Sequence, residues 1–487
     1  MNTPNSIKRR DVLRSSLYAG TALALPTWSR AADANGDIRV AVIGFKGRGG
    51  GHISSLAKMK GVRLVALCDV DSEVLNKKVE EFKKKNIELK AYTDYRKLCE
   101  DPEIDAVTIA TPNHTHTVIA MTAIAAGKHV YVEKPVSHNI WEGAELVKAA
   151  AKVEGKQIVV HGMQRRSDLG WAAAQEYIKS GAIGKTLLTR GVNYKPRKSI
   201  GKVSGPKEVP ATVNYDLWCG PRTVAPLMRE KLHYDWHWQW AYGNGDIGNQ
   251  GPHQLDVARW MIGNPEKLPL RVMSIGSRWG YEDDGQTANN QMAVYDYGKG
   301  NIPMIFDNRG LPRENMDWKL EPAYKGTRIG NIVHCEGGYI VESKAYDNDG
   351  KWNGTKFEIR DGPGHMDNFI ASIRAGKLVD SNLHVNHGHH AAALAHLANY
   401  SYRVGKKVAP GELKERLSGD KFASETLQDF LANLEANKID LGKDQAVLGP
   451  WLSFNPDTLK FEGEFAEEAN KLDAEEYREG FKLPQIS

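Results

Sequence analysis

Ile38-Arg39-Val40-Ala41-Val42-Ile43 is followed directly by Gly44-Phe45-Lys46-Gly47-Arg48-Gly49, and this stretch decides the fold. The first six residues are mostly apolar and β-branched, which predicts a short buried strand that ends at Gly44. A second apolar run, Val62 to Cys68, ends at Asp69, 25 residues after Gly44. The order of these features, a strand, a glycine-rich turn, a helix, a second strand and an acidic residue, predicts a βαβ unit that binds a dinucleotide. The glycines alone would be a weak signal.

Each part of this unit has a physical role. Glycines in the turn let backbone N–H groups approach a pyrophosphate, and the following helix directs its positive N-terminus at it. A carboxylate at Asp69 can accept both ribose hydroxyls but repels a 2′-phosphate, so we expect NAD rather than NADP. Lys46 stands where a second glycine is usual, which indicates a slightly different turn. The expected cofactor contacts here are Gly44, Phe45, Lys46, Gly47, Arg48, Gly49 and Asp69.

Apolar strands and helices continue to alternate up to residue 161. Strands are expected over 105–110, 129–133 and 157–161, and helices over 114–126 and 139–154. This alternation predicts an α/β fold with a parallel, doubly wound sheet, whose ligand lies at the carboxyl ends of the strands. Polar stretches at two of those ends add Thr111, Pro112, Asn113, His116, Glu133 and Lys134 to the expected cofactor contacts.

The chain resembles the glucose-fructose oxidoreductase/inositol dehydrogenase/rhizopine catabolism (Gfo/Idh/MocA) family in residues 110–116 (ATPNHTH), 126–135 (AGKHVYVEKP) and 248–253 (GNQGPH). The resemblance extends from residue 37 to about 405. It implies an N-terminal Rossmann domain and a C-terminal α/β domain with a large open, mostly antiparallel sheet. It also implies NAD(P)-dependent chemistry, mostly on sugars and polyols, and a homo-oligomer, a dimer or tetramer, formed through that sheet.

The same resemblance implies the catalytic residues. The family's lysine falls on Lys134, where an ammonium can stabilise developing alkoxide charge, unless it is an ordinary surface lysine. The family's Asp–His pair falls on Asn249 and His253; because an amide carries no proton, Asn249 can only orient the substrate or the imidazole. Gly251-Pro252 predicts a helix start, whose dipole keeps His253 neutral and able to accept a proton, unless this histidine merely caps the helix.

A cluster of tryptophans indicates the substrate side. Five of the 12 Trp lie between Trp218 and Trp260, and residues 233–240 alternate aromatic and polar side chains. Flat rings interleaved with donors and acceptors suit a carbohydrate, although filling of the core explains any single ring equally well. Polar residues within 164–166 and 194–198 are further candidates. The expected substrate contacts are Lys134, Arg165, Tyr194, Arg197, Trp236, His237, Trp240, Asn249 and His253, and Gln164 is assigned to the cofactor.

The N-terminal residues predict an export signal. Paired arginines within residues 8–14 precede an uncharged run and a small-residue end, the layout of a twin-arginine signal over residues 1–32, although an ordinary basic N-terminus is the plain alternative. We therefore expect an exported, periplasmic protein.

The expected domains are an NAD-binding Rossmann domain (37–160), a substrate-binding and oligomerisation domain (161–410) and an extension that wraps the core (411–487).

Composition excludes several classes of partner. Residues 1–31 carry a charge of +4 out of the total of +5, so the remainder is nearly neutral and offers no case for nucleic acid or an anionic membrane. The four cysteines are scattered without metal-type spacing, and a disulfide framework is not expected in a chain of 487 residues. A histidine-rich stretch, 384–396, is interpreted as a helix rather than a metal site, and we expect neither a metal nor a membrane anchor.

Two enzymatic hypotheses and one non-enzymatic hypothesis follow. The first is an NAD-dependent oxidoreductase that removes hydride from a hydroxyl of a sugar, polyol or glycoside. The second is an NAD-recycling glycosidase, lyase or epimerase, which oxidises its substrate only transiently; export favours it because the periplasm has no obvious pool of free NAD. The third is a carbohydrate-sensing protein with a vestigial cofactor, suggested by the amide at Asn249.

Overall fold

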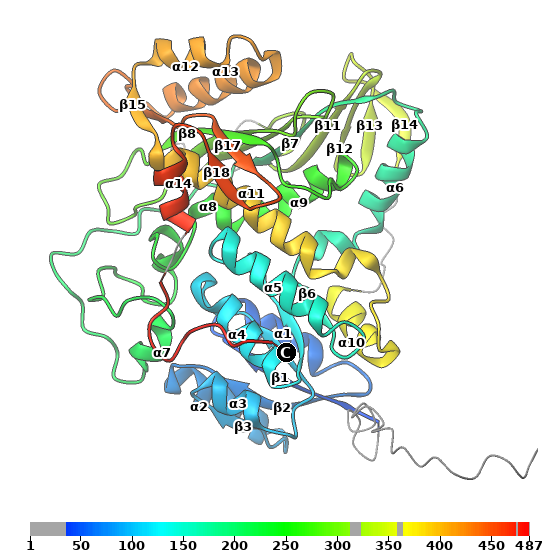
Figure 1. Cartoon of the computed structure of the whole chain (residues 1–487), viewed down its shortest axis with the longest axis vertical. Coiled ribbons are helices and arrows are strands. Elements are labelled where there is room, and N and C mark those ends of the chain that lie inside the picture. Colours follow the sequence, from blue (N-terminus) through cyan, green and yellow to red (C-terminus); the bar gives the residue numbers. More distant parts are fainter. Residues whose placement is uncertain (1–35, 312–322, 358–363, 474–475, 487) are drawn as a thin grey trace, which may run out of the picture.

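The computed structural model describes residues 36–311, 323–357, 364–473 and 476–486. The expected signal segment, 1–32, lies outside these ranges. Two sheets form the frame of the molecule, with the long helix α11 (Val385–Val404) between them (Figure 1). None of the described helices combines the length and the apolar character that a bilayer span requires.

The first sheet has six strands in the order β3-β2-β1-β4-β5-β6, and its adjacent strands are parallel. The prediction of a doubly wound parallel sheet is confirmed. The strands expected over 38–43 and 62–68 have the predicted bounds. The three later strands and the helix expected over 139–154 are one or two residues shorter at one or both ends, and the helix expected over 114–126 is shifted to 113–125. The strands are β1 (Ile38–Ile43), β2 (Val62–Cys68), β3 (Lys90–Tyr92), β4 (Ala106–Ile109), β5 (His129–Val132) and β6 (Val159–His161).

Helices cover both faces of this sheet. One face packs against α3 (Tyr95–Glu100), α4 (Asn113–Ala125) and α5 (Ile140–Lys152). The other face packs against α1 (Arg48–Leu56), α2 (Ser72–Lys83) and, from much later in the chain, α10 (His365–Ala375). The strands carry apolar side chains to both faces, which is the pattern of a parallel sheet buried on both sides.

The second sheet has 12 strands, ten of them along the path β14-β13-β12-β11-β7-β10-β9-β8-β16-β15. Among the described residues β7 and β10 are parallel and the other paired strands are antiparallel, which confirms the mostly antiparallel sheet. The strands are β7 (Thr186–Asn193), β8 (Arg271–Ser277), β9 (Asn290–Asp296), β10 (Met304–Arg309), β11 (Ile329–Cys335), β12 (Gly338–Val341), β13 (Lys344–Tyr346), β14 (Trp352–Lys356), β15 (Lys406–Val408), β16 (Ala446–Leu448), β17 (Leu452–Asn455) and β18 (Lys460–Glu462).

Helix α9 (Gly251–Met261) packs across the inner face of this sheet, between the strands and α11. On the outer face, α12 (Pro410–Leu417) and α13 (Lys421–Ala436) bury apolar side chains against β8, β9 and β10, above the sheet in Figure 1. The shorter elements are η2 (Gln164–Ser167), α6 (Leu169–Lys179), α7 (Tyr215–Cys219), η3 (Asp235–Trp238), α8 (Gly245–Asn249), η6 (Ser381–Leu383) and α14 (Ala466–Asp473).

Helix α11 joins the two halves of the molecule. Its alanines Ala391–Ala393 are fully buried, and the helix contacts both α5 of the first sheet's layer and α9 of the second. Such small side chains let helices approach closely. Gly388 likewise lets α11 approach β6, because a Cβ on Gly388 would lie only 2.7 Å from the Cβ of His161. The C-terminal segment then runs back to the first sheet, where Phe481 and Ile486 join its core (Figure 1).

Candidate functional site

A cavity of about 490 Å³ lies between the carboxyl ends of the first sheet's strands and the first turn of α9. This is the position that the parallel sheet predicts for a ligand. Most of the residues expected from the sequence line it together: Gly44, Phe45, Lys46, Gly47, Arg48, Asp69, Thr111, Pro112, Asn113, His116, Glu133, Lys134, Gln164, Arg197, Trp236, His237, Asn249 and His253.

The glycines of the turn differ in what the absence of a side chain allows. Gly44 has a φ of +76° and lies so close to Thr111 that an added Cβ would be 2.6 Å from its Cγ2. Gly49 does not line the cavity, contrary to expectation: it packs α1 against the turn, where a Cβ would lie 2.0 Å from the carbonyl oxygen of Gly44. A Cβ on Gly47 would meet nothing within 4 Å, so the turn has room for a ligand there. The nine-residue helix α1 begins directly after Gly47.

Asp69 ties the second strand to the glycine turn. Its carboxylate accepts hydrogen bonds from the backbone N–H groups of Phe45 and Asp71, both at 3.1 Å. Burial raises the pKa of Asp69, and these two hydrogen bonds oppose the increase. Lys46 directs its ammonium out of the turn to within 3.7 Å of the Asp71 carboxylate, which explains how the turn accommodates a side chain at this position.

Glu133 is a buried carboxylate at the end of β5. It accepts hydrogen bonds from Arg48 Nε at 2.9 Å, His52 Nε2 at 3.1 Å and the backbone N–H of Lys134 at 3.1 Å. Burial alone would raise the pKa of Glu133, but the His52 hydrogen bond and the charges of Lys134 and Arg48 hold it below its ordinary value. The ionised carboxylate thus orients Arg48 toward the cavity and fixes the backbone at Lys134.

Lys134 connects the first sheet to the substrate half. Its Nζ donates to the backbone carbonyl of Asn249 at 2.7 Å and lies 3.4 Å from the side-chain oxygen of the same residue. Burial lowers the pKa of Lys134, while the charge of Glu133 acts in the opposite direction. Both oxygens of Asn249 face the Lys134 ammonium, so Asn249 holds this ammonium in place. Its expected role toward a substrate or the imidazole stays a prediction.

His253 lies in the first turn of α9, which has Pro252 at its start. No side chain caps this helix, so the interpretation of His253 as a cap is not supported. The imidazole hydrogen-bonds no residue within the described ranges. Burial lowers the pKa of His253 to about 3, and the charge of Lys134 adds to the effect. The ring is therefore neutral near pH 7 and can accept a proton from a ligand.

Part of the expected aromatic cluster borders the cavity through Trp236 and His237. Residues 235–238 form the short helix η3, in which Trp236 and His237 stack with ring centroids 3.7 Å apart. His237 donates from Nδ1 to the carbonyl of Tyr234 at 2.6 Å, which leaves Nε2 as an acceptor. Burial lowers the pKa of His237 to about 3, and the charges of Lys134 and Arg197 contribute.

Three expected substrate contacts do not line the cavity. Tyr194 points to the opposite face of the second sheet, where its hydroxyl donates to Asp307 at 2.7 Å. Trp240 packs instead under the guanidinium of Arg403, 4.8 Å from the ring centroid. Arg165 forms ion pairs of 3.5 Å with Asp168 and Glu342. The partners of Tyr194 and Trp240 lie far away in the sequence, so sequence spacing does not reveal them.

Trp218, Lys195, His233 and Tyr234 also line the cavity; they lie in the stretches that the sequence analysis singled out but were not among the expected substrate contacts. One signal could have found Lys195. Successive side chains of an extended segment point to opposite sides, so a segment that directs Arg197 into the cavity also directs Lys195 there and turns Tyr194 away. His233 donates from Nε2 to the carboxylate of Asp71 at 2.9 Å and so closes the cavity near the glycine turn.

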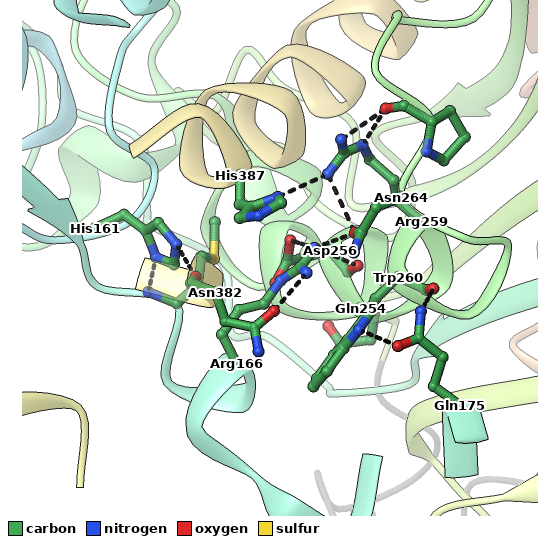
Figure 2. A network of polar contacts seen from close by, with 12 residues as sticks. His161, Arg166, Gln175, Gln254, Asp256, Arg259, Trp260, Asn264, Asn382 and His387 are labelled. Atoms are coloured by element: carbon green, nitrogen blue, oxygen red, sulfur yellow. Dashed lines mark hydrogen bonds and ion pairs between the residues drawn. The ribbon is translucent and has the colours of Figure 1, made fainter. Parts of the chain in front are cut away.

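A buried charged network holds α9 in place (Figure 2). Arg166, from the η2 segment after β6, donates two hydrogen bonds of 2.7 Å to the carboxylate of Asp256, three residues after His253. Arg259 of the same helix donates to His387 of α11 at 3.1 Å. The network links α9 to both neighbouring layers and so fixes the helix that carries His253.

Comparison with known proteins supports the architecture. Residues 38–161 match the model "Oxidoreductase family, NAD-binding Rossmann fold" (GFO_IDH_MocA), and residues 175–310 match "Oxidoreductase family, C-terminal alpha/beta domain". Together the two matches cover more than half of the chain. They confirm the prediction of an NAD-binding Rossmann domain followed by an α/β domain.

Similar curated proteins include inositol 2-dehydrogenase of Salmonella typhimurium, 29% identical over 37% of this chain and 52% of the relative. Levoglucosan dehydrogenase of Pseudarthrobacter phenanthrenivorans is 32% identical over 35% of this chain and 36% of the relative. The chain thus spans about half or less of the length of these relatives. Among solved structures, the WlbA dehydrogenase of Bordetella pertussis, crystallised with NADH and UDP-GlcNAcA, shares the fold at 18% identity, with a TM-score of 0.54 over 75% of this chain and 97% of that one.

Replacing Arg166 with Met should lower the free energy of unfolding by about 3–5 kcal/mol, because it leaves the buried Asp256 carboxylate without its partner. The matched control is Arg165→Met next to it, whose longer and half-exposed ion pairs should contribute less than about 1 kcal/mol. Denaturant unfolding of both variants measures the difference. Equal, small effects would show that the Arg166–Asp256 pair does not hold α9.

Stability should fall as the pH drops from about 6.5 toward 4. Burial lowers the pKa values of His129, His161 and His389 to about 4 in the folded protein. Because the unfolded chain binds these protons near pH 6.5 and the folded chain does not, each histidine should reduce the free energy of unfolding on the order of 1–2 kcal/mol between pH 7.5 and 5. Denaturant unfolding across this range measures the slope, which His389→Gln should flatten. A stability independent of pH would contradict the neutral buried state.

Proposed function

Because the chain belongs to the Gfo/Idh/MocA oxidoreductase family, we propose that it is an NAD-dependent oxidoreductase acting on a hydroxyl of a sugar, polyol or glycoside. One observation carries the proposal: Lys134 and the neutral His253 line the same cavity as the glycine turn. An ammonium beside an unoccupied imidazole is the pair that removal of a hydroxyl proton needs.

The turn and its surroundings fit a non-phosphorylated dinucleotide. Gly47 leaves room at the N-terminus of α1, where backbone N–H groups and the helix dipole favour a pyrophosphate. Asp69 borders the cavity with a carboxylate that suits ribose hydroxyls and disfavours a 2′-phosphate. Arg48 adds a positive charge at the same end. When bound, NAD supplies the hydride acceptor.

The chain's own residues supply the proton chemistry. His253 accepts the proton of the reacting hydroxyl, which its neutral and unoccupied ring permits. Lys134 donates a hydrogen bond to the same oxygen and stabilises its negative charge, and Asn249 holds the ammonium in position. Trp236 and His237 offer a stacked aromatic surface for a sugar ring. The inositol and levoglucosan dehydrogenases among the relatives support this class of substrate.

A redox-neutral reaction is the second candidate, and His237 favours it. Cleavage through transient oxidation requires a second base, which removes a proton from the carbon next to the oxidised one, and epimerisation at that neighbouring carbon requires the same step. His237 presents a neutral Nε2 acceptor in the same cavity as His253. The stoichiometry separates the two candidates: glycoside cleaved by the purified protein without added NAD supports the redox-neutral route, and NADH formed in proportion to substrate supports simple dehydrogenation.

We also propose export through the twin-arginine route and assembly as a dimer or tetramer. Export is supported by the paired arginines in residues 8–14, and the amount of mature protein in periplasmic extracts tests it. Because α12 and α13 cover β8, β9 and β10, an oligomer formed through the second sheet would use the part built by β11–β14. Light scattering of the purified chain tests the oligomeric state.

Lys134→Met and His253→Ala should each lower the rate of sugar oxidation about a hundredfold or more while NAD binding is retained, because neither residue belongs to the glycine turn. Turnover is followed by the absorbance of reduced nicotinamide, and cofactor content by mass spectrometry. Lys198→Met, outside the cavity lining, is the control with unchanged turnover. Full activity in both site variants would refute the assignment, and retained activity in one would remove that residue from it.

A further inference from the structure

Two cationic residues, two positions apart in the sequence, lie at the substrate end of the cavity. Lys195 and Arg197 lie in the irregular segment that follows β7, with Pro196 between them. Pro196 has a fixed φ and disfavours a helical conformation at Lys195, so the segment is extended and residues two apart point the same way. Both side chains accordingly line the cavity that holds Lys134.

Arg197 is firmly positioned. Its backbone N–H donates to the carbonyl of Gly310 at 2.8 Å, and its own carbonyl accepts a hydrogen bond from the Tyr281 hydroxyl. Its Nε donates to the buried carboxylate of Asp246 at 2.8 Å, and its side chain is only 12% exposed. Within the described ranges the two Nη groups bind no acceptor, so they remain available to a ligand.

Lys195 has no such partner. Its ammonium makes no hydrogen bond or ion pair with any residue that the structure describes. Burial lowers the pKa of Lys195, and the positive charge of Arg197 lowers it further, against the opposing charge of Asp246. No described residue fixes the Lys195 ammonium, but the two like charges face the same end of the cavity, so an anion between them would lower their repulsion.

The charges at this end of the cavity do not balance. Lys195 and Arg197 carry two positive charges and Lys134 adds a third, against the one negative charge of Asp246. The carboxylates that line the cavity are engaged elsewhere: Glu133 with Arg48 and His52, and Asp69 at the glycine turn. A neutral polyol would leave this positive charge uncompensated, whereas an anionic group on the sugar would reduce it.

We propose that Lys195 and Arg197 form a subsite for an oxyanion on the sugar, a carboxylate or a sulfate ester, so that the substrates are acidic sugars or their glycosides. The inference rests on the proposed function, since it names the substrate class of the same cavity. The planar edge of Arg197 and the ammonium of Lys195 can each donate a charge-assisted hydrogen bond to such a group.

The test compares matched pairs of sugars on the NAD-loaded full chain. Calorimetric titrations with glucuronate against glucose, galacturonate against galactose, and glucose 6-sulfate against glucose keep the ring constant and change only the charge. In at least one pair the charged sugar should bind about tenfold more tightly than the neutral one, because one hydrogen bond between charged groups changes the affinity by about that factor. The uronate and sulfate arms show which oxyanion the subsite prefers, and the preference should shrink as salt is added.

Lys195→Met should lower the affinity for the charged sugar about tenfold and leave the affinity for the matching neutral sugar unchanged. Lys198→Met is the matched control: it removes a lysine three residues away, outside the cavity lining, and should change neither affinity. Charged sugars that bind no more tightly than their neutral partners in every pair would overturn the proposal. So would a preference that survives in Lys195→Met.

The nicotinamide absorbance keeps the two proposals apart. Reduction of NAD by neutral sugars without any preference for charged ones would overturn the subsite and leave the oxidoreductase assignment standing. Tight, Lys195-dependent binding of a charged sugar with neither NAD reduction nor cleavage would support the subsite and count against the proposed reactions.

Discussion

The buried carboxylate of Glu133 is the constraint on which the site depends. A negative charge with 3% exposure at the end of β5 is stable only with partners, and α1 supplies two of them, Arg48 and His52. The same carboxylate binds the backbone of Lys134. One ionised group therefore holds the glycine turn, the first helix and the candidate catalytic lysine together. It fixes the separation between the part of the cavity expected to hold the cofactor and the part expected to hold the reacting group.

The substrate half is joined to this centre through α9. The ammonium of Lys134 reaches Asn249 just before the helix, and Arg166 binds Asp256 within it, so that His253 is held from both sides. Helix α11 packs against α9 with small, fully buried side chains. Among the residues that the structure describes, the imidazole has no hydrogen-bond partner. The surrounding contacts therefore position a ring that can hydrogen-bond a ligand.

The first sheet could be predicted closely because its signals are local: β-branched runs end at glycine or an acid, and β1 and β2 have the expected bounds. The site residues that follow its strands were found for the same reason. The substrate side was harder to predict. Tyr194 and Lys195 are neighbours, and only the pleat of the extended chain decides which one faces the cavity. Trp240 was misplaced because its partner, Arg403, is 163 residues away in sequence, a contact that no spacing rule reveals.

The most direct test of the account is a crystal structure of the chain with NAD. We expect the pyrophosphate to lie against the turn of Gly44–Arg48, the adenosine ribose beside Asp69, and the nicotinamide to face Lys134 and His253 across space open to a sugar. A cofactor bound elsewhere, or one whose nicotinamide is turned away from these two residues, would contradict the central claim and leave only the fold.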